Sequence, residues 1–207
     1  MTDVQEAVAA ERRDLADLLA GLPDEDWDSP SLCNGWRVRE VVAHLTMPFR
    51  YSIARFLLGM VRARGDFHKM ADRAARQDAE KLTADELVAV LRANAHHPWK
   101  PPGGGLVGAL SHDVIHGLDI TVALGLDRRV PLDRLQLVLD GIKPKNVRFF
   151  GADLQDVVLR ADDLDWSLGS GQQELSGSAQ DLLLVLCGRK LPPGRVSGAP
   201  SSRFTTA

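Results

Sequence analysis

The chain has 207 residues, of which 44% are hydrophobic and 26% are charged, so it is long enough to bury a core of its own. Its 25 basic and 28 acidic residues give a formal net charge of −3, so the chain has no broad positive field for a phosphate backbone, which argues against a dedicated nucleic-acid-binding protein. The sequence has no apolar run of the ~18–20 residues that cross a membrane, and its first residues lack the apolar core of a secretion signal. We therefore predict a cytoplasmic protein that binds neither nucleic acid nor membrane.

The spacing of apolar residues predicts helices throughout the first 145 residues. Apolar side chains recur every three or four positions, which is the period of one helical face. The predicted helices span residues 4–22, 37–64, 83–95, 106–124 and 131–142. Pro48 should kink or break the second of them, and Thr83 with Glu86 forms the capping box that starts the third. The charged stretch 64–81 is predicted to be a solvated helix or a linker.

The composition changes after Lys145. Short β-branched or aromatic runs, separated by Asp and Gly, predict strands at residues 157–161, 165–169 and 173–177, and a helix follows at 178–187. We predict a mainly α fold in which a helical bundle (1–145) precedes a small α+β domain (146–191) and a flexible tail (192–207).

The two cysteines, Cys33 and Cys187, are far apart and form no CxxC pair, which argues against a disulfide framework and against a thiolate zinc site. A bound metal ion would then need His or carboxylate ligands. Cys33 has no base near it in the sequence, and we interpret it as structural. Trp27 and Trp36 are interpreted as core anchors of the turn before the second helix.

His112 and His116 carry the sharpest chemical signal. Four residues apart on a helix, they lie ~40° apart around the axis with a rise of ~6 Å, so both imidazoles can reach one ion. The third ligand would be His44, whose apolar neighbours leave its ring nitrogens in need of a partner. Asp119 lies near the same face of the helix and would orient a ligand imidazole. Glu40 is an alternative carboxylate ligand, although a role in the first turn of its helix is favoured.

Each of these residues also has a purely structural interpretation. A histidine on an apolar helix is more often a hydrogen-bonded core residue than a metal ligand. Asp119, taken alone, is interpreted as a carboxylate on the helix surface. The other histidines are predicted to lie at the surface or at a helix end, where His96 and His97 precede Pro98. His68 lies in the charged stretch.

Two separated motifs resemble one known family. Trp27 with LCNGWRVREVVAHL (32–45), followed by HDVIHGLDI (112–120), resembles the mycothiol-dependent maleylpyruvate isomerase family, which is related to the DinB-like metalloenzyme bundles. Residues 165–189 are similar to the small C-terminal domain of that family, which itself is similar to sterol-carrier domains.

The resemblance implies a DinB-like four-helix bundle that holds one divalent ion, usually zinc with nickel as an alternative, through His44, His112 and His116. The family typically has Glu where His112 stands, so this site would be more positive by about one charge. Mycothiol or a similar thiol would be the second cofactor. Arg189, at the Gly-Arg of the family, would bind a carboxylate as a catalytic residue, or would simply place a cation at the end of its helix.

The implied activity is isomerisation or S-transfer on a small electrophilic substrate, by a monomer or homodimer. Two alternatives use the same residues. One is a non-catalytic module that binds a small molecule or lipid and has a structural or vestigial metal site. The other is hydrolysis by a metal-bound water, which needs no thiol.

Overall fold

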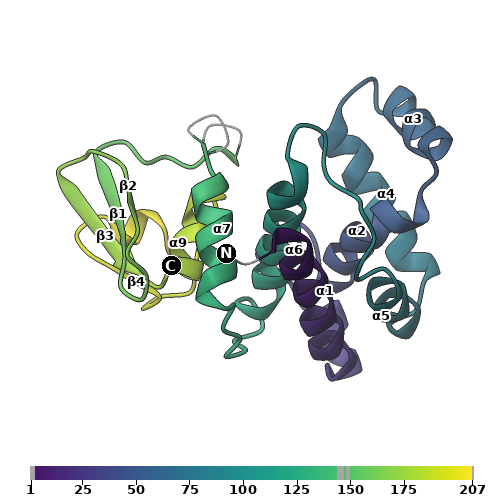
Figure 1. Cartoon of the computed structure of the whole chain (residues 1–207), viewed down its shortest axis with the longest axis horizontal. Coiled ribbons are helices and arrows are strands. Elements are labelled where there is room, and N and C mark those ends of the chain that lie inside the picture. Colours follow the sequence, from purple (N-terminus) through teal and green to yellow (C-terminus); the bar gives the residue numbers. More distant parts are fainter. Residues whose placement is uncertain (1–2, 144–146, 148–149, 207) are drawn as a thin grey trace. The chain divides into compact units, whose positions relative to one another are not determined.

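The computed structural model describes residues 3–143, 147 and 150–206. The chain divides into two compact units, residues 1–116 and 117–207, and the division falls within a single helix, α6 (Gly105–Thr121). Figure 1 colours the first unit from purple to teal and the second from green to yellow.

The first unit consists of helices. Its elements are α1 (Val4–Ala20), the short 3₁₀ helix η1 (Asp24–Asp28), α2 (Val38–Arg50), α3 (Ile53–Arg62), α4 (Phe67–Lys81), α5 (Ala84–Ala93) and the first part of α6. Helix α2 packs against α4 and α5, and α1 packs against α5. These helices lie where the apolar spacing predicted them, because each of the packed helices turns one apolar face toward its neighbours.

Local sequence signals determine where these helices begin and end. The side chain of Thr83 accepts a hydrogen bond from the backbone N–H of Glu86, and the carboxylate of Glu86 accepts one from the backbone N–H of Thr83, which confirms the predicted capping box. Pro48 lies inside α2, which ends at Arg50, and a new helix begins at Ile53. The predicted helix around Pro48 is thus broken into two.

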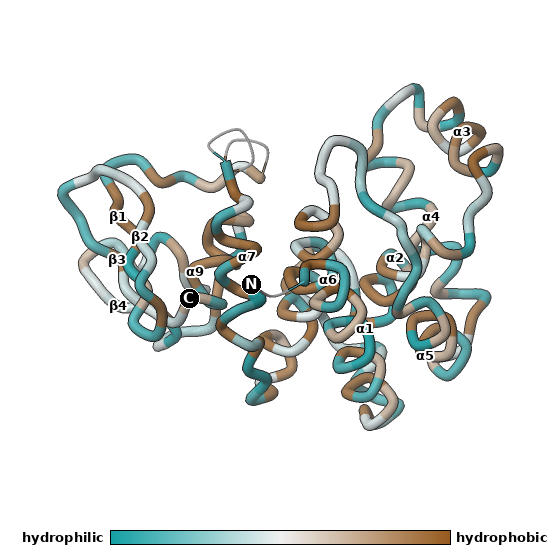
Figure 2. Tube along the Cα trace, in the orientation of Figure 1, coloured by the Kyte–Doolittle hydropathy of each residue, from teal (hydrophilic) through white to brown (hydrophobic). Residues whose placement is uncertain are grey.

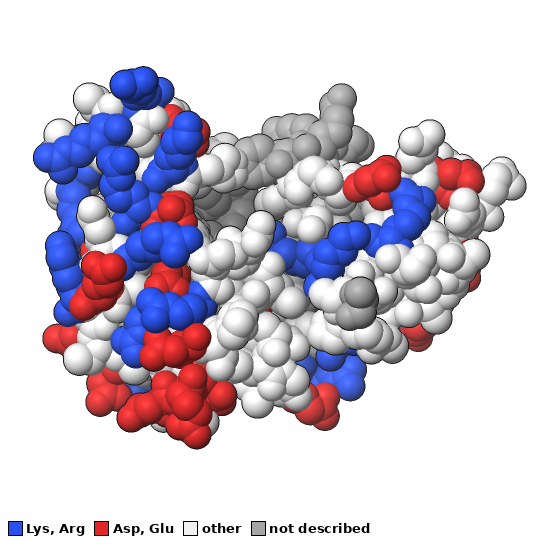
Figure 3. Space-filling view, turned by 180° about the vertical axis from the view of Figure 1, so that it is seen from behind, with Lys and Arg blue, Asp and Glu red and all other residues white. Residues whose placement is uncertain are grey.

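The charged stretch predicted as a solvated helix or a linker is a helix, α4, with one buried side. Met70, Ala71, Ala74 and Ala75 are buried, whereas Arg73 and Arg76 are exposed. Basic side chains gather over α3 and α4, at the left of Figure 3. The exposed basic residues of these two helices and the turn between them are Arg55, Arg62, Arg64, Lys69, Arg73, Arg76 and Lys81.

The second unit combines a small sheet with helices. After the last part of α6 come α7 (Leu132–Gly141), β1 (Val157–Ala161), β2 (Ser167–Leu168), β3 (Gln173–Gly177), α9 (Ala179–Leu186), β4 (Val196–Ser197) and the 3₁₀ helix η2 (Ser201–Arg203). The strand order is β2-β1-β3-β4; β1 and β3 are parallel, and the edge strands are antiparallel to them. Every residue of α9 is buried, and Figure 2 shows its apolar sequence in brown.

The structure confirms the predicted fold class, a mainly α bundle followed by a small α+β part, but it differs in two predicted boundaries. The predicted boundary at residue 145 assigned α7 to the bundle. In the structure, α7 packs against α9 and belongs to the second unit. Residues 192–206 are built into the fold, where we had predicted a flexible tail. Strand β4 pairs with β3, and the buried Phe204 accepts a hydrogen bond from the backbone of Leu191.

No helix among the described residues combines the length and apolar character needed to cross a membrane.

Candidate metal centre

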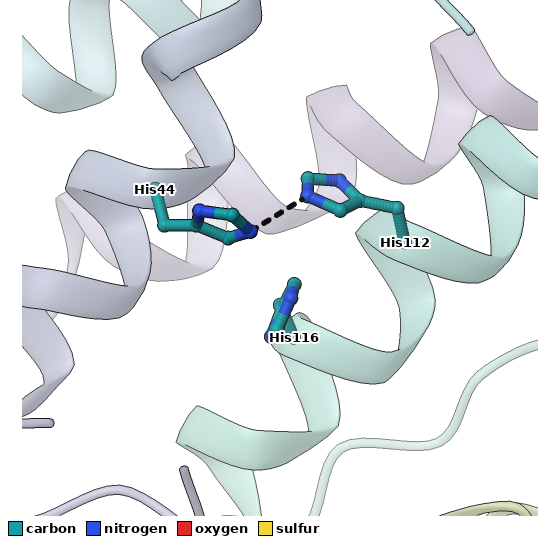
Figure 4. Close-up of side chains that lie close together, drawn as sticks. All are labelled: His44, His112 and His116. Atoms are coloured by element: carbon teal, nitrogen blue, oxygen red, sulfur yellow. Dashed lines mark hydrogen bonds between the residues drawn. The ribbon is translucent and has the colours of Figure 1, made fainter. Parts of the chain in front are cut away.

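Three histidines from two helices of the first unit converge on one point. His44 comes from α2, and His112 and His116 come from α6 (Figure 4). The Nε2 atoms of His44 and His112 are 3.3 Å apart, and one ring nitrogen of each of the three residues lies within 4.8 Å of the others. The ring centroids of each pair are 4.9–5.1 Å apart. The structure thus brings together the three residues that were predicted from the sequence as metal ligands.

The local sequence of each helix explains this placement. His44 lies in the middle of α2 among residues that are all buried, from Val41 to Met47. Such an apolar face directs the imidazole into the bundle. His112 and His116 are separated by four residues, so α6 presents both on one face toward α2.

The Nδ1 atoms of the two α6 histidines have polar neighbours. Nδ1 of His112 lies 3.0 Å from Oδ1 of the buried Asp113, and Nδ1 of His116 lies 3.6 Å from Sγ of Cys33. Sequence reasoning missed both contacts. Cys33 was interpreted as structural because no base is near it in the chain, yet the fold places an imidazole beside it.

Two half-buried tryptophans flank the histidines. The ring of Trp36 is 5.2 Å from that of His44, and the ring of Trp99 is 5.1 Å from that of His112. The indole of Trp36 donates a hydrogen bond to Asp72. Trp27 is buried in the core, as expected, but Trp36 lies beside the candidate site rather than acting only as an anchor. Trp99 was not singled out from the sequence, because the loop that carries it has no helical pattern.

Glu40 fills the first-turn role that the sequence favoured. It closes the capping box of α2 by accepting hydrogen bonds from the backbone and the guanidinium of Arg37. Burial alone would raise the pKa of Glu40, but the hydrogen bonds from Arg37 outweigh it and hold the pKa below its ordinary value. Arg37 thus engages the carboxylate that was considered as an alternative ligand.

The two residues predicted to assist the site from the C-terminal side pair with each other. Within the second unit, Arg189 donates two hydrogen bonds to the buried Asp119, at 2.7 and 2.9 Å. The role of Asp119 toward a ligand imidazole stays a prediction. The carboxylate that lies beside the ring of His112 is that of Asp113.

The remaining histidines lie outside the cluster. His68 and His96 are exposed, and Nη1 of Arg13 lies 3.1 Å from Nε2 of His96. His97 follows the end of α5 and packs against Phe49. Burial, with a smaller contribution from the positive Arg12, lowers the pKa of His97.

The cluster has the donor set that a divalent ion of the zinc type requires. Three imidazoles with their ring nitrogens close together match the His₃ sites in which a fourth position stays open. If Nδ1 of His112 donates to Asp113, its Nε2 carries a lone pair that faces His44, as a metal ligand needs.

A helical bundle with three converging imidazoles defines the first unit as a candidate metal-binding domain. Residues 8–98 match the family described as "Mycothiol maleylpyruvate isomerase N-terminal domain". This match, which covers the part of the chain that contains His44, confirms the resemblance seen in the sequence.

The chain is also similar to proteins of Mycobacterium tuberculosis. It is 26% identical over 213 residues to uncharacterized protein Rv0036c of strain H37Rv and to uncharacterized protein MT0041 of strain CDC 1551. Each match covers 87% of this chain and 83% of the relative.

Two solved structures also match over 97% of both chains. The crystal structure of the mycothiol-dependent maleylpyruvate isomerase has a TM-score of 0.49 at 15% identity, and a mutant of that isomerase has 0.46 at 16%.

Proposed function

We propose that this protein is a metal-dependent isomerase or S-transferase that uses mycothiol or a similar low-molecular-weight thiol and acts on a small electrophilic substrate. The observation that carries the proposal is the convergence of His44, His112 and His116 in a bundle whose residues 8–98 match the maleylpyruvate isomerase N-terminal family. Zinc is the ion that suits three neutral imidazoles best, and nickel is the alternative.

The three histidines would hold the ion from one side, since two of them come from adjacent turns of α6 and the third from α2. A bound divalent ion supplies the charge that keeps a coordinated thiol deprotonated and nucleophilic at neutral pH. Trp36 and Trp99, whose rings lie next to His44 and His112, would contact the thiol or the substrate through their apolar faces.

Arg189 was considered as a catalytic residue that binds a carboxylate. Its two hydrogen bonds to Asp119 instead favour a structural role, because the guanidinium edge that would hold a substrate carboxylate already holds a protein one. The proposed site therefore consists of residues of the first unit.

Metal analysis of protein purified without a histidine tag tests the first half of the proposal. We expect about one zinc or nickel ion per chain, and loss of that ion in the His112→Ala and His116→Ala variants. His68→Ala is the matched control, because this histidine is exposed and lies outside the cluster. A protein that holds no ion and cannot be loaded with one contradicts the proposal.

Thiol consumption tests the second half. Metal-loaded protein should accelerate the reaction of mycothiol with monochlorobimane, and the metal-free protein and His112→Ala should not. If metal binds but no thiol reacts with any electrophile, and a lipid or small molecule copurifies, the protein is a binding module instead.

A further inference from the structure

Asp113 lies between a candidate ligand and a buried arginine. One carboxylate oxygen, Oδ1, is 3.0 Å from Nδ1 of His112, and the other, Oδ2, accepts a hydrogen bond of 2.8 Å from Nε of Arg12. The side chains of Arg12 and Asp113 are 0% and 1% exposed. The carboxylate of this buried ion pair therefore also contacts a candidate metal ligand.

Arg12 is held rigidly by contacts other than Asp113. Its Nη1 donates to the backbone carbonyls of Asn94, Ala95 and His97, and its guanidinium stacks on the ring of Phe49 with 4.8 Å from Cζ to the centroid. Because helix α1 and the turn after α5 fix the arginine, the arginine in turn fixes the carboxylate. The position of Asp113 is therefore set from outside the histidine cluster.

We propose that Asp113, anchored by Arg12, is a positioning residue that sets the tautomer and ring orientation of His112. This inference rests on the proposed function in so far as His112 is taken as a metal ligand. A carboxylate at Nδ1 requires the proton on that nitrogen, so Nε2 keeps its lone pair and faces Nε2 of His44 at 3.3 Å. The negative charge also makes the imidazole a stronger donor to a metal ion.

The same chain contains a matched buried carboxylate that contacts other groups. Asp78 is 3% exposed and pairs with Arg50 and Arg55, and it accepts a hydrogen bond from Tyr51. Substituting Asp78 also removes a buried carboxylate from its ion pairs in the first unit. It therefore controls for any loss of stability that Asp113 variants suffer.

The first experiment reads the tautomer directly, in metal-free protein labelled with ¹⁵N-histidine. With neutral rings, the ¹⁵N shifts of His112, assigned with the His112→Ala variant, should report the Nδ1–H form in the unaltered protein and in Asp78→Asn. In Asp113→Ala they should move toward the Nε2–H form. An Nε2–H tautomer in the unaltered protein, or shifts that Asp113→Ala leaves unchanged, would overturn the inference.

The second experiment titrates the proteins with Co²⁺ and with Zn²⁺. Relative to the unaltered protein, we expect affinity to fall by about 10-fold in Asp113→Asn, which keeps an acceptor oxygen, and by about 100-fold in Asp113→Ala. The visible Co²⁺ spectrum should change in both variants and remain unchanged in Asp78→Asn. If Asp113→Ala does not fold, Asp113→Asn still carries the comparison.

The two proposals fail in different ways. If the unaltered protein binds neither metal, the proposed function is wrong, while the ¹⁵N measurement still decides the tautomer. If it binds metal and both Asp113 variants bind it equally well with the same spectrum, the role of Asp113 is wrong and the proposed function stands.

Discussion

Asp119 and Arg189 are separated by 70 residues in the sequence and form a two-point ion pair in the second unit, with Nε–Oδ1 and Nη2–Oδ2 distances of 2.7 and 2.9 Å. The carboxylate of Asp119 is fully buried, and the side chain of Arg189 is 22% exposed. The pair connects the last turns of α6 with the segment that follows α9. Its geometry is that of a fork holding a carboxylate, which favours a structural role.

Removing Arg189 should therefore lower the stability of the folded protein. In Arg189→Ala the buried Asp119 loses this guanidinium, and we expect the free energy of unfolding to fall by about 3 kcal/mol, the low end for a broken buried pair. Urea denaturation followed by circular dichroism measures the change. Arg160→Ala is the control, because Arg160 pairs with Glu174 at an exposed position and should change stability little. If the Arg189→Ala protein is as stable as the unaltered one, the structural role is wrong and the catalytic role of Arg189 is favoured instead.

Glu40 should make α2 sensitive to acid. The hydrogen bonds from Arg37 hold the pKa of Glu40 below its ordinary value in spite of burial, so the folded state binds its proton more weakly than the unfolded state does. Its contribution is complete above the unfolded pKa of about 4.3 and is lost as the pH falls through the lower, folded value. We expect Glu40→Gln to lower stability at pH 7 and to have a smaller effect near pH 3. An equal loss at both pH values in urea titrations would contradict this.

Tyr51 offers a direct spectroscopic check, since it is the single tyrosine of the chain. Burial, with the hydrogen bond to Asp78, raises its pKa to about 12. The neutral phenol therefore stabilises the fold fully below the unfolded pKa of about 10, and this contribution is lost as the pH rises from there to about 12.

Absorbance at 295 nm, recorded within milliseconds of a jump to high pH, measures this titration. The midpoint should lie near 12 in folded protein and near 10 in guanidinium chloride. In Asp78→Asn we expect a lower midpoint, because the negative partner is gone. A folded protein that titrates at about 10 would show that Tyr51 is solvated.

Cys187 should not react with thiol reagents in the folded protein. Burial raises its pKa to about 12, a direction that Asp119 reinforces and Arg189 opposes, so almost no thiolate forms at pH 8. Mass spectrometry after treatment with iodoacetamide should find Cys187 unmodified in folded protein, and both Cys33 and Cys187 modified in denaturant. Rapid modification of Cys187 in the folded state would be inconsistent with its position at the end of α9.

The sequence alone determined the elements whose signals are local. The period of apolar residues located the helices, the Thr83–Glu86 box located the start of α5, and the spacing of His112 and His116 placed two imidazoles on one face of α6. Each of these signals arises within a few residues of chain, where the geometry of the helix converts spacing into direction.

Tertiary structure decided which groups meet. The carboxylate next to His112 is that of Asp113. Adjacent residues of a helix point ~100° apart around its axis, so the spacing of residues favoured Asp119, which lies nearer the face of the histidines. Likewise, the contact of Cys33 with His116 and the packing of α7 on α9 join segments far apart in the chain. An amphipathic face or a reactive side chain specifies that it needs a partner, but only the packing of the whole unit selects which partner it obtains.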